Sequence, residues 1–180
     1  MKTAILLALT TFGVALAQRG PGPGTGQTTT AITAEERNRL LFMREEEKLA
    51  RDVYRFLGEK WNLRIFHNIA SSEENHFQQV GALLTRYGIA DPAKAPAGEF
   101  TDARLAALYQ ELITKGSASV KDALEVGVLI EKTDIADIEK SLAITVHWDI
   151  RRVFTNLISA SYNHLDSFET VLEIIVAMQS

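Results

Sequence analysis

The sequence predicts an all-α fold built from four long helices, and three observations support this prediction. Apolar residues recur with helical periodicity almost continuously from Thr33 onward, and no segment alternates as a strand would. Residues typical of helix caps stand at the ends of the periodic segments. Short links join the helices within each pair, whereas the link between the second and third long helices is long.

The segment before Thr33 is predicted to consist of a signal peptide and a tether. Met1 and Lys2 give a positive start, an apolar run follows, and Ala15-Leu16-Ala17 matches the small residues that a signal peptidase recognises. The run is shorter than the roughly 20 residues that cross a bilayer, which disfavours a membrane span. We therefore expect a signal peptide over 1–17, a Gly/Pro/Thr-rich flexible tether over 18–32, and a folded domain over 33–180 in an exported (periplasmic or secreted) protein.

The first helical pair is predicted from its end signals. Thr33 and Glu36 have the spacing of a capping box, and the helix that they open extends to about Lys60. The next helix begins near Arg64 and ends at Tyr87, where Gly88 is the C-terminal signal.

A long connection over 89–119 separates the two pairs. It contains two prolines and one short helix, predicted to follow a Thr101 cap and to end at Gly116. A third long helix then spans about 119–143, a turn covers 144–148, and Asp149 opens a fourth long helix that extends to about Met178. Short links make antiparallel neighbours, and the long link lets the chain cross from one end of the domain to the other.

Composition excludes several classes of protein. The chain has 180 residues, 46% of them apolar, which suffices for a core of one domain. Because there is no cysteine, disulfides, thiolate metal sites and a cysteine nucleophile are excluded, so any metal must bind to His, Asp or Glu. The net charge of −4 disfavours a nucleic-acid partner, and we expect no membrane partner after signal cleavage.

Ionisable residues interrupt the apolar stripe of every long helix near its midpoint. Antiparallel helices of similar length align their middles, so these side chains are expected to meet in one layer. The layer is predicted to contain Glu47, Glu73, His76, Glu131, Asp134 and His164.

A metal centre explains this layer better than an apolar core does. Four carboxylates at one height could not all stay ionised without cations, whereas two divalent ions would cancel their charge. Carboxylates with neutral histidines suit two iron ions per chain, with manganese as the other option. Ion pairing is the alternative for each acid, with Arg44, Lys48, Arg51 and Arg151 as available cations, and Glu46 is the substitute ligand if Glu47 points elsewhere.

Three motifs resemble those of rubrerythrin-type ferritin-like proteins. Glu47-x-x-Ala50-Arg51-x-x-Tyr54 is similar to their first-helix pattern, Glu73-x-x-His76 to their second-helix pattern, and Glu131-x-x-Asp134 to their third-helix pair of acids. Longer runs, Met43 to Tyr54 among them, resemble an uncharacterised prokaryotic branch of that superfamily, a domain of unknown function, over about 33–168. The resemblance implies a ferritin-like four-helix bundle with a long crossover that contains one short helix.

The fourth helix departs from the related di-iron proteins. They place a glutamate three residues before the histidine, where this chain has Ser161, so an asymmetric or mononuclear site is an alternative. Tyr54, Tyr162 and Ser161 are the expected hydrogen-bonding neighbours of the ligands.

Three functions follow from these features. The first is an oxidoreductase that acts on Fe(II), O2 or peroxide through the metal ligands, with no further catalytic residue. The second is a non-catalytic metal-sequestering module, and the third is a metal-free secreted helical bundle that serves as an interaction domain. A homodimer is the expected assembly if the protein pairs at all.

Overall fold

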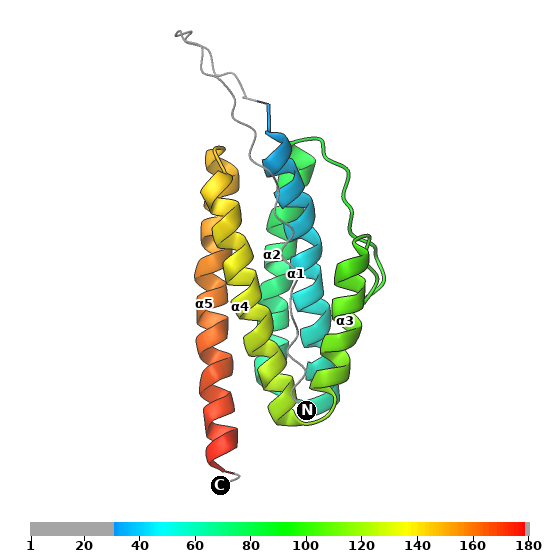
Figure 1. The fold of residues 1–180 in the computed structure, drawn as a ribbon, viewed down its shortest axis with the longest axis vertical. Helices are drawn as coiled ribbons and strands as arrows, with labels where there is room; N and C mark the ends of the chain where they lie inside the picture. Colours follow the sequence, from blue (N-terminus) through cyan, green and yellow to red (C-terminus); the bar gives the residue numbers. More distant parts are fainter. Residues whose placement is uncertain (1–30, 179–180) are drawn as a thin grey trace. The chain divides into compact units, whose positions relative to one another are not determined.

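The computed structural model describes residues 31–178, and within them the chain is all-α, with no strand. The five helices are α1 (Ala34–Trp61), α2 (Arg64–Arg86), α3 (Ala103–Gly116), α4 (Val120–Ile144) and α5 (Trp148–Ala177) (Figure 1). The all-α prediction and the order of long and short helices are confirmed. The predicted signal peptide and residues 18–30 of the predicted tether lie outside the described residues.

Local signals set most helix ends where the sequence predicts them. Thr33 and Glu36 form the reciprocal capping box of α1, and the Ser119 side chain accepts a hydrogen bond from the backbone of Asp122 at the start of α4. Asn62 ends α1 in the left-handed conformation, at φ 50°.

Two predicted helix starts are wrong by one residue. Asp102, not Thr101, caps α3, because the Asp102 side chain accepts from the Arg104 backbone N–H. Both backbone N–H groups at 101 and 102 donate to the buried Glu45 carboxylate of α1, at 2.5 and 3.0 Å. A tertiary contact therefore fixes where this helix begins. The last helix begins at Trp148 rather than at Asp149.

The four long helices pack in pairs. α1 contacts α2, α4 contacts α5, and the two pairs meet through α1 with α4 and through α2 with α5. α1 and α5 run in one direction and α2 and α4 in the other (Figure 1). The connection after α2 returns the chain to the opposite end, where α4 begins, and its helix α3 packs on α1 and α4.

The α1 helix is buried on nearly all sides over residues 43–54, although seven of these twelve residues are charged. The reason is that α2, α4 and the crossover with α3 surround it. Its outward-facing charges therefore hold the crossover: Arg44 pairs with Asp91 at 2.7 Å, and Lys48 donates to the carbonyl of Pro96 at 2.9 Å.

Two apolar clusters lie at different heights along the long helices. One includes Tyr54, Phe66, Leu124 and Phe168, while the other contains residues earlier in α1 and α5 and later in α2 and α4. On all four long helices the predicted polar residues fall between the two clusters. The layer is therefore closed above and below by apolar side chains.

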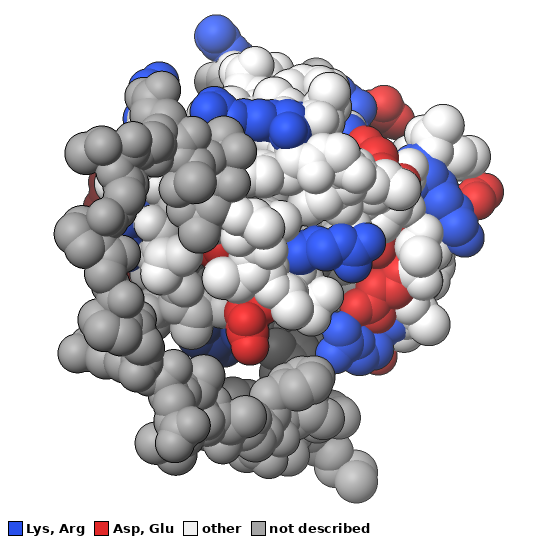
Figure 2. All heavy atoms as spheres, turned by 90° about the horizontal axis from the view of Figure 1, so that it is seen from above, with Lys and Arg blue, Asp and Glu red and all other residues white. Residues whose placement is uncertain are grey.

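The surface at the end where α4 turns into α5 has a mixed character. Val146 and Trp148 are 72% and 66% exposed there. Lys and Arg side chains are interspersed with Asp, Glu and uncharged residues over the described atoms visible from this end (Figure 2). Across 31–178, none of the helices has both the length and the apolar character that a membrane crossing requires.

Candidate metal centre

Five of the six predicted ligands gather in two overlapping groups. Glu47, Glu73 and His76 form one group, and Glu73, Glu131 and His164 form the other; in each group the potential ligand atoms lie within 4.8 Å of one another. All four long helices contribute. The alignment of helix midpoints therefore places these residues together, as the sequence predicts.

Glu73 lies between the two histidines. Its Oε2 is 3.0 Å from Nδ1 of His76, and its Oε1 is 2.8 Å from Nδ1 of His164. The two imidazole rings stack with centroids 5.8 Å apart. The two oxygens of the Glu73 carboxylate thus face different halves of the site, the half with His76 and the half with His164.

The outer carboxylates complete the two halves. Glu47 Oε2 lies 3.3 Å from Nδ1 of His76, and Glu131 Oε2 lies 3.6 Å from Nδ1 of His164. Each histidine therefore has the shared Glu73 on one side and a carboxylate of its own on the other.

The site is buried, and some of its polar atoms have no hydrogen-bond partner. Glu47, Glu73 and Glu131 are each at most 2% exposed. Glu47 Oε1 and Asp134 Oδ1 have no hydrogen-bond partner. A buried carboxylate oxygen without a partner costs free energy, so a bound positive charge at this place would stabilise the fold.

The cations that the ion-pairing alternative requires are engaged elsewhere. Arg44 pairs with Asp91, and Lys48 pairs with Asp52. The remaining two behave likewise: Arg51 pairs with Asp52 and Glu74, and Arg151 donates to the carbonyls of Leu142 and Thr145. None of these four neutralises the predicted ligands.

Burial and mutual repulsion set the protonation of the acids. Burial and the charges of Asp134 and Glu73 hold the pKa of Glu47 well above its usual range. Burial likewise raises the pKa of Glu131 to about 7, against the opposing effect of the nearby His164.

Glu73 and the histidines shift in the opposite sense. Burial alone would raise the pKa of Glu73, but the neighbouring imidazoles of His164 and His76 lower it to about 2. Burial alone would lower the pKa of His164, but the adjacent carboxylates of Glu131 and Glu73 raise it to about 9. The pKa of His76 is also raised, by Glu73. Both histidines are therefore favoured in their protonated, cationic form beside these carboxylates.

The hydrogen-bonding neighbours are only partly those predicted. Tyr54 donates to Glu131 Oε1 at 2.7 Å, and Ser161 donates to Asp134 Oδ2 at 2.6 Å. The prediction for Tyr162 is wrong, because its hydroxyl donates to Glu139 and the residue is 49% exposed. It follows Ser161 directly and so points about 100° away from the inward face.

Asp134, the sixth predicted ligand, belongs to neither three-residue group. Burial and the charges of Glu73 and Glu131 raise its pKa to about 8. Asp137, one turn further along α4, is also buried and was not singled out from the sequence. The spacing of Glu131, Asp134 and Asp137 at three-residue intervals is the signal that could have found it.

The other two histidines lie away from the centre. His67 is exposed near the start of α2. His147 lies in the turn before α5, with Nδ1 2.7 Å from Glu36. Glu125 lies on the outer face of α4, paired with Lys121 and Lys115.

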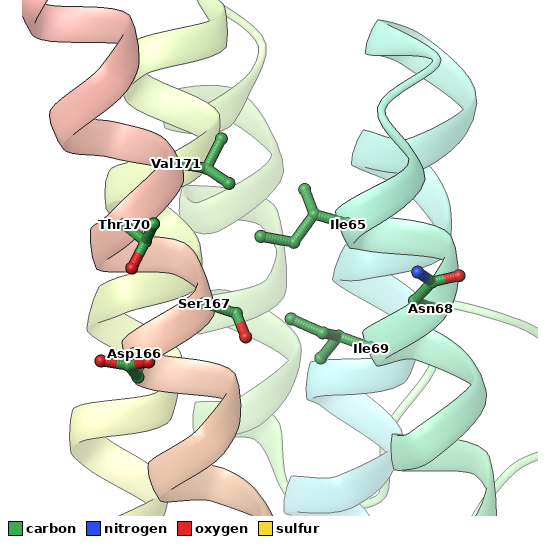
Figure 3. A pocket seen from close by; sticks show the side chains of 7 residues that line it. All are labelled: Ile65, Asn68, Ile69, Asp166, Ser167, Thr170 and Val171. Carbon is green, nitrogen blue, oxygen red and sulfur yellow. The ribbon is translucent and has the colours of Figure 1, made fainter.

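An open groove of about 500 Å³ runs between α2 and α5 next to the centre. Ile65 and Ile69 face Ser167 and Val171 across it (Figure 3). Ile69 is one turn before Glu73, and Ser167 is about one turn after His164, whose side chain is 11% exposed. The groove therefore approaches the centre from solvent.

These donors suit a transition-metal pair. Imidazole nitrogen and carboxylate oxygen are ligands of iron and manganese, and one carboxylate already faces both halves. The unpartnered oxygens of Glu47 and Asp134 are further ligand atoms. The residues present therefore fit a dinuclear carboxylate site.

Known proteins place the chain among uncharacterised relatives. A family described as an uncharacterised protein domain, DUF2202, matches residues 36–177. The uncharacterised protein MJ0754 of Methanocaldococcus jannaschii is 48% identical over 142 residues, which cover 78% of this chain and 77% of that protein.

Two solved structures are similar. The crystal structure of hypothetical protein MJ0754 from Methanococcus jannaschii has a TM-score of 0.80 at 45% identity, covering 84% of this chain and 87% of the other. The crystal structure of a DUF305 fragment from Deinococcus radiodurans has a TM-score of 0.59 at 16% identity, covering 78% and 97%. The second likeness concerns the fold alone.

Proposed function

The chain belongs to the DUF2202 family, and we propose that it is an exported metal-binding protein with a dinuclear iron or manganese carboxylate centre. Its ligands are Glu47, Glu73, His76, Glu131 and His164. We further propose that the centre turns over as an oxidoreductase with Fe(II), O2 or peroxide.

One observation carries the proposal: Glu73 presents one oxygen to each of two stacked histidines. A structural ion pair needs only one partner for each carboxylate, and the nearby arginines and lysines are paired elsewhere. Three buried carboxylates and two imidazoles with no permanent cation among them are typical of a metal site.

The helix arrangement supports the same proposal. Two helical hairpins joined by one long crossover, with ligands from all four long helices, are characteristic of a ferritin-like four-helix bundle. We therefore assign this architecture to α1, α2, α4 and α5, with α3 as the short helix of the crossover.

The chain's own residues hold and orient the ligands. When bound, the metal ions would supply the redox chemistry with O2 or peroxide. Tyr54 holds Glu131 by its 2.7 Å hydrogen bond, which fixes one carboxylate oxygen and leaves the other facing His164. The groove between α2 and α5 gives a small oxidant a path toward His164.

A sequestering function without turnover is the second candidate, and Ser161 favours it. The α5 helix supplies no carboxylate here, because a serine stands at position 161; its hydroxyl donates to Asp134. The two groups then share only three carboxylates, and a single bound metal ion is the natural consequence.

The test measures metal content and oxidation together. The mature protein (residues 18–180) is loaded anaerobically with Fe(II), washed, analysed for iron, and then exposed to air in an absorbance spectrometer. We expect close to two irons per chain and a new near-ultraviolet band on oxidation. We expect Glu73→Gln to remove both the bound iron and the absorbance band. Glu74→Gln is the matched control, because the adjacent, half-buried Glu74 pairs with Arg51 and Arg55 instead.

The alternatives give different results. One iron per chain without the band supports sequestration. No bound iron or manganese, with the helical circular dichroism intact, refutes the metal centre and leaves a helical interaction domain.

A further inference from the structure

An exposed apolar patch lies at the turn between α4 and α5. Ile144, Val146 and Trp148, which form this turn patch, are 40%, 72% and 66% exposed. Thr145 and His147 have extended backbones, with ψ 123° and 124°, so side chains two residues apart along this link point to the same side. Thr145 is buried and His147 is half-buried, which leaves the turn patch facing solvent. Neither apolar cluster of the domain includes these three side chains.

Hydrogen bonds hold the turn that carries the patch. The Glu36 carboxylate accepts from the backbone N–H groups of Val146 and His147, at 2.8 and 2.9 Å. Arg151 donates to the carbonyl of Leu142 at 3.0 Å. The turn patch is therefore presented in a fixed conformation, and little conformational entropy is lost when a partner covers it.

Unpaired arginines border the turn patch. Arg151 and Arg152 follow it in the first turn of α5, and Arg37 lies in the first turn of α1, next to Glu36. All three arginines are exposed, and none of them pairs with a carboxylate within residues 31–178. Figure 2 views this end, where Lys and Arg side chains border uncharged surface, with Asp and Glu among them.

Exposed basic residues outnumber exposed acidic ones at this end, although the whole chain has a net charge of −4. The comparison covers the first turns of α1 and α5 and the last turns of α2 and α4. The exposed residues there are Arg37, Arg86, Lys140, Arg151 and Arg152 against Glu35 and Glu139. The turn patch therefore suits a partner that is both anionic and able to take up apolar side chains.

A second copy of this chain is a poor match for the turn patch. In a symmetric pair the same surfaces meet, so the arginines around one patch would face those around the other. A bilayer with anionic phospholipids offers phosphate groups to the arginines and an apolar interior to Val146 and Trp148. Tryptophan suits this boundary, because its ring is apolar while its N–H can stay among the headgroups.

The chain also enters the domain at this end. Ile32 packs on an apolar cluster just before α1 begins, and Glu36 in the first turn of α1 binds the α4–α5 turn. The apolar run of the predicted signal peptide precedes Ile32 in the sequence. Until its cleavage, that run would tie this end of the domain, and not the opposite end, to the membrane.

We propose that the turn patch and the arginines around it dock the mature protein on the surface of an anionic phospholipid bilayer. The contact is peripheral, and no helix crosses the membrane. It replaces the expectation from the sequence that no membrane partner remains after signal cleavage. The proposal does not depend on the metal centre.

The experiment measures co-sedimentation of the mature protein (residues 18–180) with lipid vesicles. Residues 31–180 form a compact unit, and the apolar N-terminal run is absent from this protein and so cannot insert. Vesicles of phosphatidylglycerol mixed equally with phosphatidylcholine are compared with vesicles of phosphatidylcholine alone. We expect binding to the anionic vesicles to be at least tenfold tighter, and to weaken when ionic strength rises from about 0.1 M to about 1 M.

Variants at the two ends of the domain separate the patch from general stickiness. Trp148→Ser and Val146→Ser should each weaken binding to the anionic vesicles several-fold. Ile174→Ser is the matched control, because Ile174 is 54% exposed in the last turn of α5, at the opposite end, so binding should not change. Arg152→Gln should also weaken binding, whereas Arg64→Gln, at the exposed start of α2, should not. If Trp148→Ser fails to fold, Val146→Ser tests the same prediction.

Three results would overturn the inference. The first is no binding to anionic vesicles, or equal binding to both kinds of vesicle. The second is binding that Trp148→Ser and Val146→Ser leave unchanged. The third is a dimer that forms without lipid and that Trp148→Ser dissociates, since the turn patch then binds a second copy of the chain.

Discussion

The hydroxyl of Tyr54 on α1 donates a 2.7 Å hydrogen bond to Oε1 of Glu131 on α4. The Tyr54 ring is fully buried and packs on Phe66 and Phe168, with centroids 6.1 and 5.2 Å away. One residue thus joins the apolar cluster to the candidate centre and connects the two helical pairs.

Tyr54→Phe keeps this ring packing and removes only the hydroxyl. We expect the free energy of unfolding of the metal-free protein to fall by about 1–3 kcal/mol, because a buried Glu131 oxygen loses its donor. Denaturant titration measures this change. Tyr162→Phe is the control, since loss of that exposed hydroxyl should change the free energy of unfolding by less than about 0.5 kcal/mol.

The metal-free protein should lose stability as pH rises from 5 to 9. Burial and nearby carboxylates raise the pKa of Asp134 to about 8. Protonation of Asp134 therefore stabilises the folded state, and this stabilisation is lost as pH rises from about 4 toward 8. His164 acts in the same sense: its pKa of about 9 gives stability that is present below about 6.5 and lost through 9.

Thermal unfolding in EDTA measures this dependence. Asp134→Asn should flatten the fall of Tm with pH, and saturating Mn(II) should remove most of it, because the metal replaces the bound protons. Asp166→Asn, on the exposed face of α5, should leave the slope unchanged. A Tm that rises steadily from pH 5 to 9 without metal would contradict the prediction.

Glu36 should stabilise the turn between α4 and α5. Its fully buried carboxylate accepts from the backbone N–H groups of Thr33, Val146 and His147, at 3.1, 2.8 and 2.9 Å. Glu36→Ala leaves these donors without a partner, and we expect a loss of about 2–4 kcal/mol. Urea unfolding tests this, with the adjacent exposed Glu35→Ala expected to cost less than about 0.5 kcal/mol.

The buried pair of Lys48 and Asp52 should depend on both partners. Their charged atoms lie 2.5 Å apart, both side chains are fully buried, and Asp52 also accepts from the Gly98 backbone. Asp52→Ala leaves the ammonium group without its carboxylate and should cost about 3–5 kcal/mol.

A double mutant separates the pair from its surroundings. In a Lys48→Met background, Asp52→Ala should cost clearly less than it does alone, because no charge is then left unpaired. Equal costs in both backgrounds would show that the two residues act independently.

The helices and much of the centre follow from sequence pattern. Periodicity and capping residues place the helix ends within one or two residues, because these are local interactions. The polar interruptions at Glu47, Glu73, Glu131 and His164 fall at the helix midpoints, and antiparallel packing alone then brings them together.

Sequence reasoning is wrong where two consecutive residues are both suitable for the same structural role. Tyr162 lies off the stripe of Ser161, His164 and Phe168, and that stripe already indicated an outward position. Thr101 and Asp102 are equally good caps, and the choice between them depends on Glu45 of α1, 56 and 57 residues earlier in the chain.

The sequence by itself determined that this protein is helical, where its long helices begin and end, and which acids and histidines share a height, because these depend on interactions within a few residues. The tertiary structure alone decided what each charge in residues 43–54 contacts. All three of Glu45, Glu46 and Glu47 are buried, yet Glu45 accepts from the backbone of the crossover, Glu47 lies against His76, and Glu46 Oε2 has no hydrogen-bond partner. Consecutive residues of a helix point about 100° apart, so their roles depend on which neighbour covers each side of α1.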